Sequence, residues 1–194
     1  MKNVKKVDNK DLPSKLELRR WLLHSIGVSD VSVLDTCAGA GHVWNGMRAH
    51  VNITKWVRCD IKPRQAGTLQ MTAMEAVKAL PLSEFNVIDI DPYGDPFGPY
   101  LAALQRITQP TTFFLTHGHI GHGQMSNESV SAAGIPLDWN YPRTPTLSAY
   151  FTQRTIEATW LYADVVVAGE VLHPHVDYYG IHVTPNNGTH PSHP

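Results

Sequence analysis

Short apolar segments alternate with segments of helical periodicity along most of the chain, and this alternation limits the fold more than any other feature of the sequence. Most of the strand-like patterns give way to apolar residues at helical spacing before the next strand-like pattern begins. Such an order predicts an α/β protein with a parallel, doubly wound sheet. The predicted strands are Val31–Asp35, Lys55–Ile61, Leu69–Met71, Phe85–Ile90 and Thr111–Thr116, and the predicted helices between them are His42–His50, Ala73–Leu80 and Pro99–Ile107.

A further helix is expected before the first strand. Ser14 lies three residues before Glu17, which is the spacing of a capping box, and Gly27 follows the apolar pattern as a terminator. These signals predict an N-terminal helix over residues 14–27.

The second half of the chain begins with a segment of different composition. Residues 117–145 are rich in Gly, Ser, Asn and Pro, which indicates an insertion that acts as a lid over a site, as a surface for stacking unpaired bases, or as both. Thr144 and Pro145 then predict the start of a helix. The remaining predictions are a closing antiparallel hairpin of Val165–Leu172 and Tyr178–Val183 and a disordered tail over residues 186–194.

Length and composition predict one domain over residues 1–185. A chain of 194 residues that is 42% hydrophobic can build one compact core but not two ordinary domains. Its apolar runs are far shorter than the roughly 20 residues that a membrane helix needs, so we expect no membrane contact. Cys37 and Cys59 lie in strand-like segments, where reduced thiols act as small apolar side chains, and this favours a cytoplasmic protein.

Basic residues are concentrated at the N-terminus, although the formal net charge is only −1. The near-neutral total argues against attraction of nucleic acid by the whole surface. Seven of the 16 lysines and arginines fall within the first 20 residues. They predict either a solvated arm and helix face or an edge that contacts a polyanion.

Two predicted strands end in residues that suit a nucleoside ligand with an amino acid end. Ligands of an open parallel sheet bind outside the carboxyl ends of its strands. The first strand runs into a turn, residues 35–41, in which Gly39 and Gly41 permit a close backbone approach. Asp35 at its head would repel a pyrophosphate, which disfavours a dinucleotide, but it suits a cation. Asp60 ends the second strand, where an acid can accept hydrogen bonds from both ribose hydroxyls, and Ile61 follows as an apolar residue.

The spacing of this turn resembles the first motif of class I S-adenosylmethionine-dependent methyltransferases. The resemblance implies a Rossmann-like fold with a seven-stranded, mostly parallel sheet and a C-terminal antiparallel hairpin. It also implies S-adenosyl-L-methionine as the cofactor, with its ammonium group oriented by the first acid and its adenine beside the residues after the second and third strands. The implied cofactor-binding residues are Asp35, Cys37, Ala38, Gly39, Gly41, Asp60, Ile61, Ala73 and Met74.

A second motif follows the fourth strand. Residues 89–94 resemble the (Asn/Asp)-Pro-Pro-(Tyr/Phe) loop of methyltransferases that modify exocyclic amino groups, and more closely the Asp-Pro-(Phe/Tyr)-Gly loop of the tRNA guanine-N2 dimethyltransferase family. Asp91 and the carbonyl of Pro92 can accept hydrogen bonds from an amino group and expose its lone pair, and Tyr93 can stack on the base. These three are the candidate catalytic residues.

Together the motifs predict an enzyme that methylates an exocyclic amino group of a nucleobase, in RNA rather than DNA. The alternatives are a DNA amino-methyltransferase, a small-molecule or protein methyltransferase, and a non-catalytic subunit that binds the cofactor. A homo-oligomer or an accessory protein is expected to help select the site. His117, His119 and His122 are interpreted as polar loop residues or substrate contacts, with no metal, because no cysteine or acid completes a ligand set.

Overall fold

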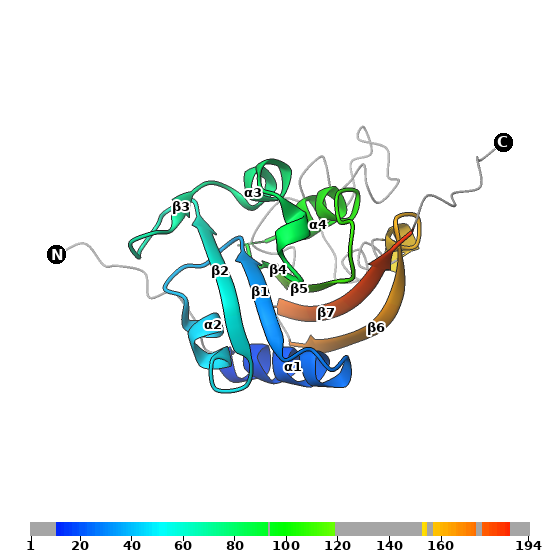
Figure 1. Cartoon of the computed structure of the whole chain (residues 1–194), viewed down its shortest axis with the longest axis horizontal. Coiled ribbons are helices and arrows are strands. Elements are labelled where there is room, and N and C mark those ends of the chain that lie inside the picture. The colour runs from blue at the N-terminus through cyan, green and yellow to red at the C-terminus, as the bar shows by residue number, and fades with distance from the viewer. Residues whose placement is uncertain (1–10, 93, 119–152, 155–156, 174–175, 187–194) are drawn as a thin grey trace.

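The computed structural model describes residues 11–92, 94–118, 153–154, 157–173 and 176–186. These residues form a seven-stranded sheet in the order β3-β2-β1-β4-β5-β7-β6 (Figure 1). Strands β1 to β5 run parallel, and β7 is inserted antiparallel between β5 and β6. The predicted α/β sheet with its closing hairpin is confirmed. The strands are β1 Asp30–Asp35, β2 Asn52–Asp60, β3 Leu69–Gln70, β4 Val87–Ile90, β5 Thr111–Gly118, β6 Ala163–Leu172 and β7 Val176–Pro185.

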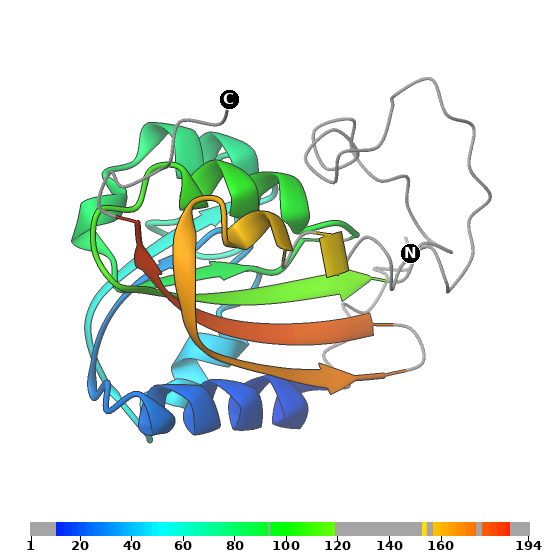
Figure 2. The same cartoon turned by 90° about the vertical axis from the view of Figure 1, so that its right-hand side faces the viewer.

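Helices cover both faces of the sheet (Figure 2). The helices α1 Leu12–Ser25 and α2 His42–Met47 lie on one face, and α3 Ala73–Ala79 and α4 Phe97–Leu104 lie on the other. Each face has its own apolar core, one that includes Leu22, Val33 and Trp44 and one that includes Ile88 and Tyr100. Burial on both sides explains why the segment 31–34 of β1 and the strand β4 are mostly apolar in the sequence.

The alternation of side chains along β4 decides which way its acidic residues face. Ile88 and Ile90 pack in the core under α3 and α4, whereas Val87 packs in the core under α1 and α2. Side chains of a strand alternate between the faces, so Asp89 shares the α1 face with Val87. Asp91 continues this alternation just beyond the end of the strand, and its side chain contacts α1.

The connection between β2 and β3 contains no helix among its residues 61–68, all of which are described. Within the described part of the chain, the short α2 is therefore the one helix next to β2 in the sequence that lies on the α1 face. Of the residues of β2, only Cys59 is fully buried, in contrast to the buried strands β1 and β4.

The predicted start of the first helix is wrong. Helix α1 begins at Leu12, after Asp11, and has no side-chain cap. Ser14 lies inside the helix, and its Oγ lies 3.2 Å from Nε2 of His173 in the hairpin. Packing against the C-terminal strands therefore fixes this end of the helix in place of a capping box. A capping box occurs instead at the start of α3, between Thr72 and Glu75.

The predicted insertion begins too early, because residues 117 and 118 belong to β5. The rest of that segment, residues 119–145, and most of the helix predicted after it lie outside the described residues, as does the tail from residue 187. Within the described part of the chain, no helix is long and apolar enough to cross a membrane.

Candidate cofactor and acceptor site

The ends of β1, β2 and β4 meet at the carboxyl edge of the sheet, as the sequence predicted. Asp35 and Asp89 are register partners in the parallel pair β1–β4. The turn after β1 is joined to β2 by a hydrogen bond of 2.9 Å from the Ala38 N–H to the Cys59 carbonyl. The end of β3 is joined to β2 by a bond of 3.2 Å from the Met71 N–H to the Asp60 carbonyl. The fold thus brings together candidate residues that are far apart in the sequence.

The glycine turn is shaped by its backbone. Gly41, which precedes α2, has a φ of 70°, a conformation that costs other residues about 1–2 kcal/mol. A Cβ at this position would lie 2.9 Å from the ring of Trp56. Only glycine therefore satisfies both the conformation and the space.

Two backbone donors hold the carboxylate of Asp60. The Gly39 N–H donates to its Oδ2 at 2.8 Å, and the Lys62 N–H donates to its Oδ1 at 2.7 Å. Each carboxylate oxygen can accept more than one hydrogen bond. Asp60 is therefore oriented by the protein and can still accept hydrogen bonds from two neighbouring hydroxyl groups.

Asp35 is a buried acid, 5% exposed, that no cation contacts directly among the described residues. The Trp56 indole N–H donates to its Oδ2 at 3.3 Å. Burial raises the pKa of Asp35 well above its usual value, and the nearby Asp89 carboxylate raises it further. The site at the head of the glycine turn thus favours a cation that would neutralise this acid.

Asp89 is bound by Arg19 from helix α1. The Arg19 guanidinium donates to both oxygens of Asp89, and the Trp44 indole N–H donates to Oδ2 at 2.7 Å. Arg19 is only 1% exposed. Both sequence interpretations of the N-terminal basic cluster are therefore wrong for Arg19, because it neutralises a buried acid of the sheet and faces neither solvent nor a polyanion.

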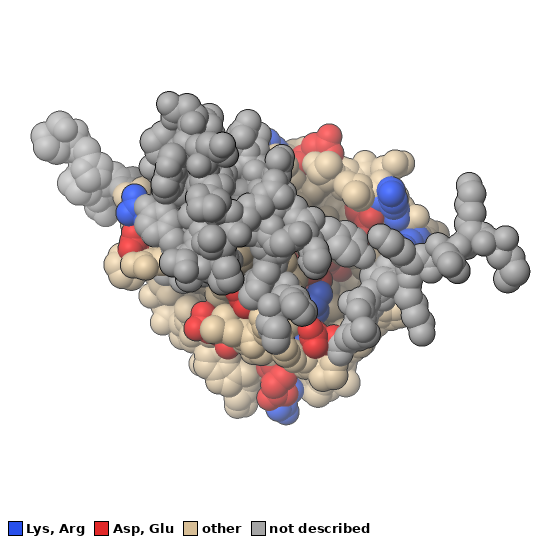
Figure 3. All heavy atoms as spheres, turned by 180° about the vertical axis from the view of Figure 1, so that it is seen from behind, with Lys and Arg blue, Asp and Glu red and all other residues tan. Residues whose placement is uncertain are grey.

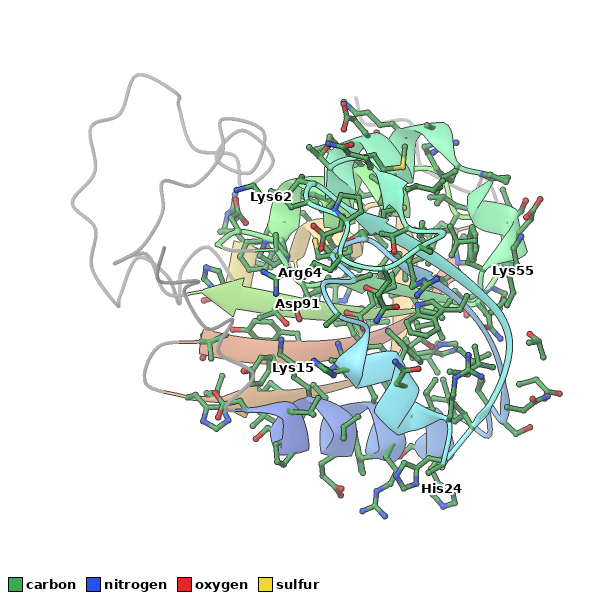
Figure 4. The ribbon with its side chains drawn as sticks, turned by 90° about the vertical axis from the view of Figure 1, so that its left-hand side faces the viewer. Lys15, His24, Lys55, Lys62, Arg64 and Asp91 are labelled. Atoms are coloured by element: carbon green, nitrogen blue, oxygen red, sulfur yellow. The ribbon has the colours of Figure 1, made fainter. Side chains whose placement is uncertain are left out.

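Asp91 is bound by Lys15, one helical turn before Arg19. The two side chains form an ion pair at the carboxyl edge of the sheet (Figure 4). The Lys15 ammonium also lies 5.4 Å from the centre of the Tyr178 ring. Lys15 was absent from the sequence-based candidates. Four residues of a helix and two residues of a strand both span about 6–7 Å, so Lys15 and Arg19 on α1 can face Asp91 and Asp89 in turn. Pro92 is half-buried, and Tyr93 lies outside the described residues.

The remaining cofactor candidates differ in exposure. Cys37 is half-buried beside Thr36 and the backbone of Asp91, and burial raises the pKa of its thiol. Ile61 is 57% exposed, which leaves its apolar side chain free to contact a ligand. Ala73 is buried and Met74 is half-buried at the start of α3.

Two histidines that the structure describes in strands β5 and β7, His117 and His182, contact other side chains of the protein. His117 is buried, with its ring 4.9 Å from that of Phe97. Nδ1 of His182 lies 3.0 Å from the Thr112 hydroxyl. Among the described residues, no group of three or more His, Cys, Asp and Glu side chains could hold a metal ion, and His119 and His122 lie outside that part of the chain.

No protein-family model matches the chain, and no curated protein sequence matches it. Solved structures share its fold at low identity. A complex of Trm1 from Pyrococcus horikoshii with S-adenosyl-L-methionine has a TM-score of 0.55 and 12% identity, over 92% of this chain and 56% of that one. Magnesium protoporphyrin IX methyltransferase (ChlM) from Synechocystis PCC 6803, with the same cofactor bound, has a TM-score of 0.53 and 8% identity, over 91% and 80%.

A third structure, of a Pyrococcus horikoshii protein provisionally described as an RNA methyltransferase, has a TM-score of 0.51 and 13% identity, over 89% of this chain and 85% of that one. The chain has the Rossmann-like fold of these methyltransferases. It spans just over half of the Trm1 chain.

Proposed function

We propose that the chain is an S-adenosylmethionine-dependent N-methyltransferase that acts on an exocyclic amino group of a nucleobase, in RNA rather than DNA. The observation that carries this proposal is the contact between the two motifs: the N–H and the hydroxyl of Thr36 in the glycine turn each donate a hydrogen bond of 2.9 Å to the Asp89 carbonyl. The acceptor motif after β4 therefore lies directly beside the predicted cofactor motif after β1.

The residues at the carboxyl edge fit S-adenosylmethionine. Asp60 is oriented for a ribose diol, and the buried Asp35 suits an ammonium group. Ile61 offers an exposed apolar side chain for adenine. When bound, the cofactor supplies an electrophilic methyl group on its sulfonium.

The acceptor side of the site works by positioning. Asp91 and the Pro92 carbonyl accept hydrogen bonds from the amino group and expose its lone pair. Lys15 holds the Asp91 carboxylate in place at the edge of the sheet. The proton that the nitrogen loses passes to Asp91 or to solvent.

RNA is favoured as the substrate by the resemblance of residues 89–94 to the loop of tRNA guanine-N2 dimethyltransferases. The structural neighbour described as an RNA methyltransferase, which this chain covers over 85% of its length, adds support. A second copy of the chain or an accessory protein would contribute to the choice of site.

The proposal is tested by isothermal titration with S-adenosylhomocysteine and by transfer of radiolabelled methyl groups to RNA and DNA. We expect micromolar cofactor binding by the wild type and its loss in Asp60→Ala. Asp91→Ala is expected to bind the cofactor normally but to lose methyl transfer. Full activity of Asp91→Ala would refute the role of Asp91 in binding the acceptor amino group. Absence of S-adenosylhomocysteine binding by the wild type would refute the proposed methyltransferase function.

A further inference from the structure

A cleft lies over β2, on the side where the β2–β3 connection contains no helix. It has a volume of about 460 Å³, and its lining includes Asn45, Arg48, Trp56, Arg58 and Gln65. None of these residues belongs to the predicted cofactor or acceptor residues. We call this feature the β2 cleft.

Two arginines in the β2 cleft share one aromatic ring. The guanidinium carbon of Arg48 lies 5.7 Å from the centre of the Trp56 ring, and that of Arg58 lies 5.1 Å from it. Contacts of this kind hold a guanidinium in place without neutralising its charge. Within the described part of the chain, neither arginine forms an ion pair with a carboxylate.

The lining of the β2 cleft is basic as a whole. It contains Arg48, Lys55 and Arg58 and no acidic residue. Of these three, Lys55 is the one that forms an ion pair within the described residues, with Glu84. In the view from behind Figure 1, the visible described residues show basic and acidic side chains interspersed (Figure 3). The β2 cleft therefore concentrates positive charge on a protein whose net charge is −1.

The β2 cleft is also continuous with the predicted active site. The Gln65 side chain accepts a hydrogen bond from Arg58 and donates one to the Ala40 carbonyl in the glycine turn. Beyond it, the exposed residues Lys62 and Arg64 lie toward the same edge of the sheet as Asp91 (Figure 4). Basic side chains thus extend from the β2 cleft toward the carboxyl ends of the strands.

We propose that the β2 cleft binds the phosphodiester backbone of the RNA whose base is methylated, an inference that rests on the proposed function. A guanidinium matches the geometry of a phosphate, with which it can form two parallel hydrogen bonds. Contacts to the backbone fix the register of a nucleic acid strand without reading its sequence. The cleft would hold the strand while a neighbouring nucleotide enters the site at Asp91.

The test uses Arg48→Gln, because Arg48 is exposed, whereas Arg58 also holds the loop through Gln65 and the Ala66 carbonyl. Binding of a fluorescein-labelled, single-stranded oligoribonucleotide to the full chain is measured by anisotropy at several salt concentrations. We expect Arg48→Gln to bind about 3- to 10-fold more weakly at low salt, with the slope of log affinity against log salt smaller by about 1. Lys78→Gln, an exposed lysine on α3 in the other layer, is the matched control and should bind as the wild type does.

Two readouts separate failure of the β2 cleft from failure of the proposed function. Arg48→Gln should keep wild-type affinity for S-adenosylhomocysteine and a wild-type unfolding midpoint. If the wild type methylates RNA and Arg48→Gln binds that RNA with unchanged affinity and salt dependence, the proposal that the β2 cleft binds RNA is wrong, whereas the proposed methyltransferase function stands. If the wild type binds the cofactor but neither binds nor methylates RNA, the RNA substrate is wrong, and the β2 cleft proposal falls with it. Binding of DNA alone, weakened in Arg48→Gln, would overturn the assignment to RNA.

Discussion

Arg19 of helix α1 donates three hydrogen bonds, of 2.8 to 3.0 Å, to the carboxylate of Asp89 in β4, 70 residues further along the chain. Both side chains are almost fully buried. The pair attaches the N-terminal helix to the central strand that ends in the acceptor motif. The stability of the helix and the geometry of the site are therefore connected.

Removal of Arg19 is expected to be strongly destabilising. Arg19→Ala leaves the Asp89 carboxylate buried without its cation, which costs about 3–5 kcal/mol. Arg20→Ala on the same helix is the matched control, because its exposed pair with Glu17 contributes at most about 1 kcal/mol. Urea unfolding at neutral pH measures both. Equal losses in the two variants would contradict the importance of the buried pair.

Asp35 is expected to lower the stability of the free protein at neutral pH. Burial raises the pKa of its carboxyl group, so the stability that the protonated group contributes is present below the unfolded pKa and is lost as the pH rises through the folded pKa. Asp35→Asn removes this loss. We expect its unfolding midpoint to exceed that of the wild type at pH 7, by about 2–4 °C per kcal/mol gained, and the difference to shrink toward pH 4. A lower midpoint at pH 7 would contradict the raised pKa.

Cofactor binding is expected to release a proton. An ammonium group placed beside Asp35 favours the ionised carboxylate, whereas the free protein favours the protonated one. The affinity for S-adenosylhomocysteine should therefore rise with pH over the range in which Asp35 titrates. Calorimetry in two buffers with different ionisation enthalpies measures the proton directly. Binding without proton release in this range would show that Asp35 does not receive the ammonium group.

Substitutions of Gly41 and Gly27 distinguish the cost of backbone strain from the cost of a steric clash. Both glycines have a positive φ, 70° and 69°, but a Cβ at Gly27 meets no atom within 4 Å, whereas one at Gly41 meets Trp56. Gly27→Ala should cost about 1–2 kcal/mol from backbone strain alone. Gly41→Ala should cost about 1–3 kcal/mol more, because Trp56 must move. Urea unfolding measures the free energy of unfolding of the two variants. Similar losses of stability would mean that the Trp56 side chain moves aside at little cost.

Lys15 is expected to matter for methyl transfer more than for cofactor binding. Lys15→Gln removes the ion pair that positions the Asp91 carboxylate. On the proposed function, we expect kcat to fall about 10-fold, which corresponds to about 1.4 kcal/mol, while the affinity for S-adenosylhomocysteine stays unchanged. Arg20→Gln serves as the control on the same helix. Loss of cofactor binding in Lys15→Gln would show that Lys15 supports the cofactor-binding residues and not the acceptor residue Asp91.

Much of the carboxyl edge was predictable from local patterns. Asp35, Asp60 and Asp91 each follow a strand-like run, and strands of a parallel sheet end at a common edge. The glycine pattern after Asp35 identified the turn, whose positive φ at Gly41 explains why glycine is there. These features need only the neighbouring residues of the chain, and for that reason the sequence predicts them.

The partners of those acids were not predictable in the same way. No local pattern shows that α1 packs over the sheet beside β4, so Lys15 and Arg19 looked like members of a basic arm. The sequence likewise gave no signal that the guanidinium groups of Arg48 and Arg58 would both contact the Trp56 ring. The ion pairs of Lys15 and Arg19 join residues that are 76 and 70 positions apart in the chain.

The sequence by itself determined the order of strands and helices, the glycine turn and the acids at the strand ends, because hydrophobic periodicity and backbone conformation act over a few residues. Only the tertiary structure decided the charge state and environment of those acids. It paired Asp89 with Arg19 and Asp91 with Lys15. Among the described residues, it left Asp35 buried without a direct ion pair and the arginines of the β2 cleft without carboxylate partners. Desolvation and ion pairing depend on which surfaces meet in space, and that is settled only when the helices pack on the sheet.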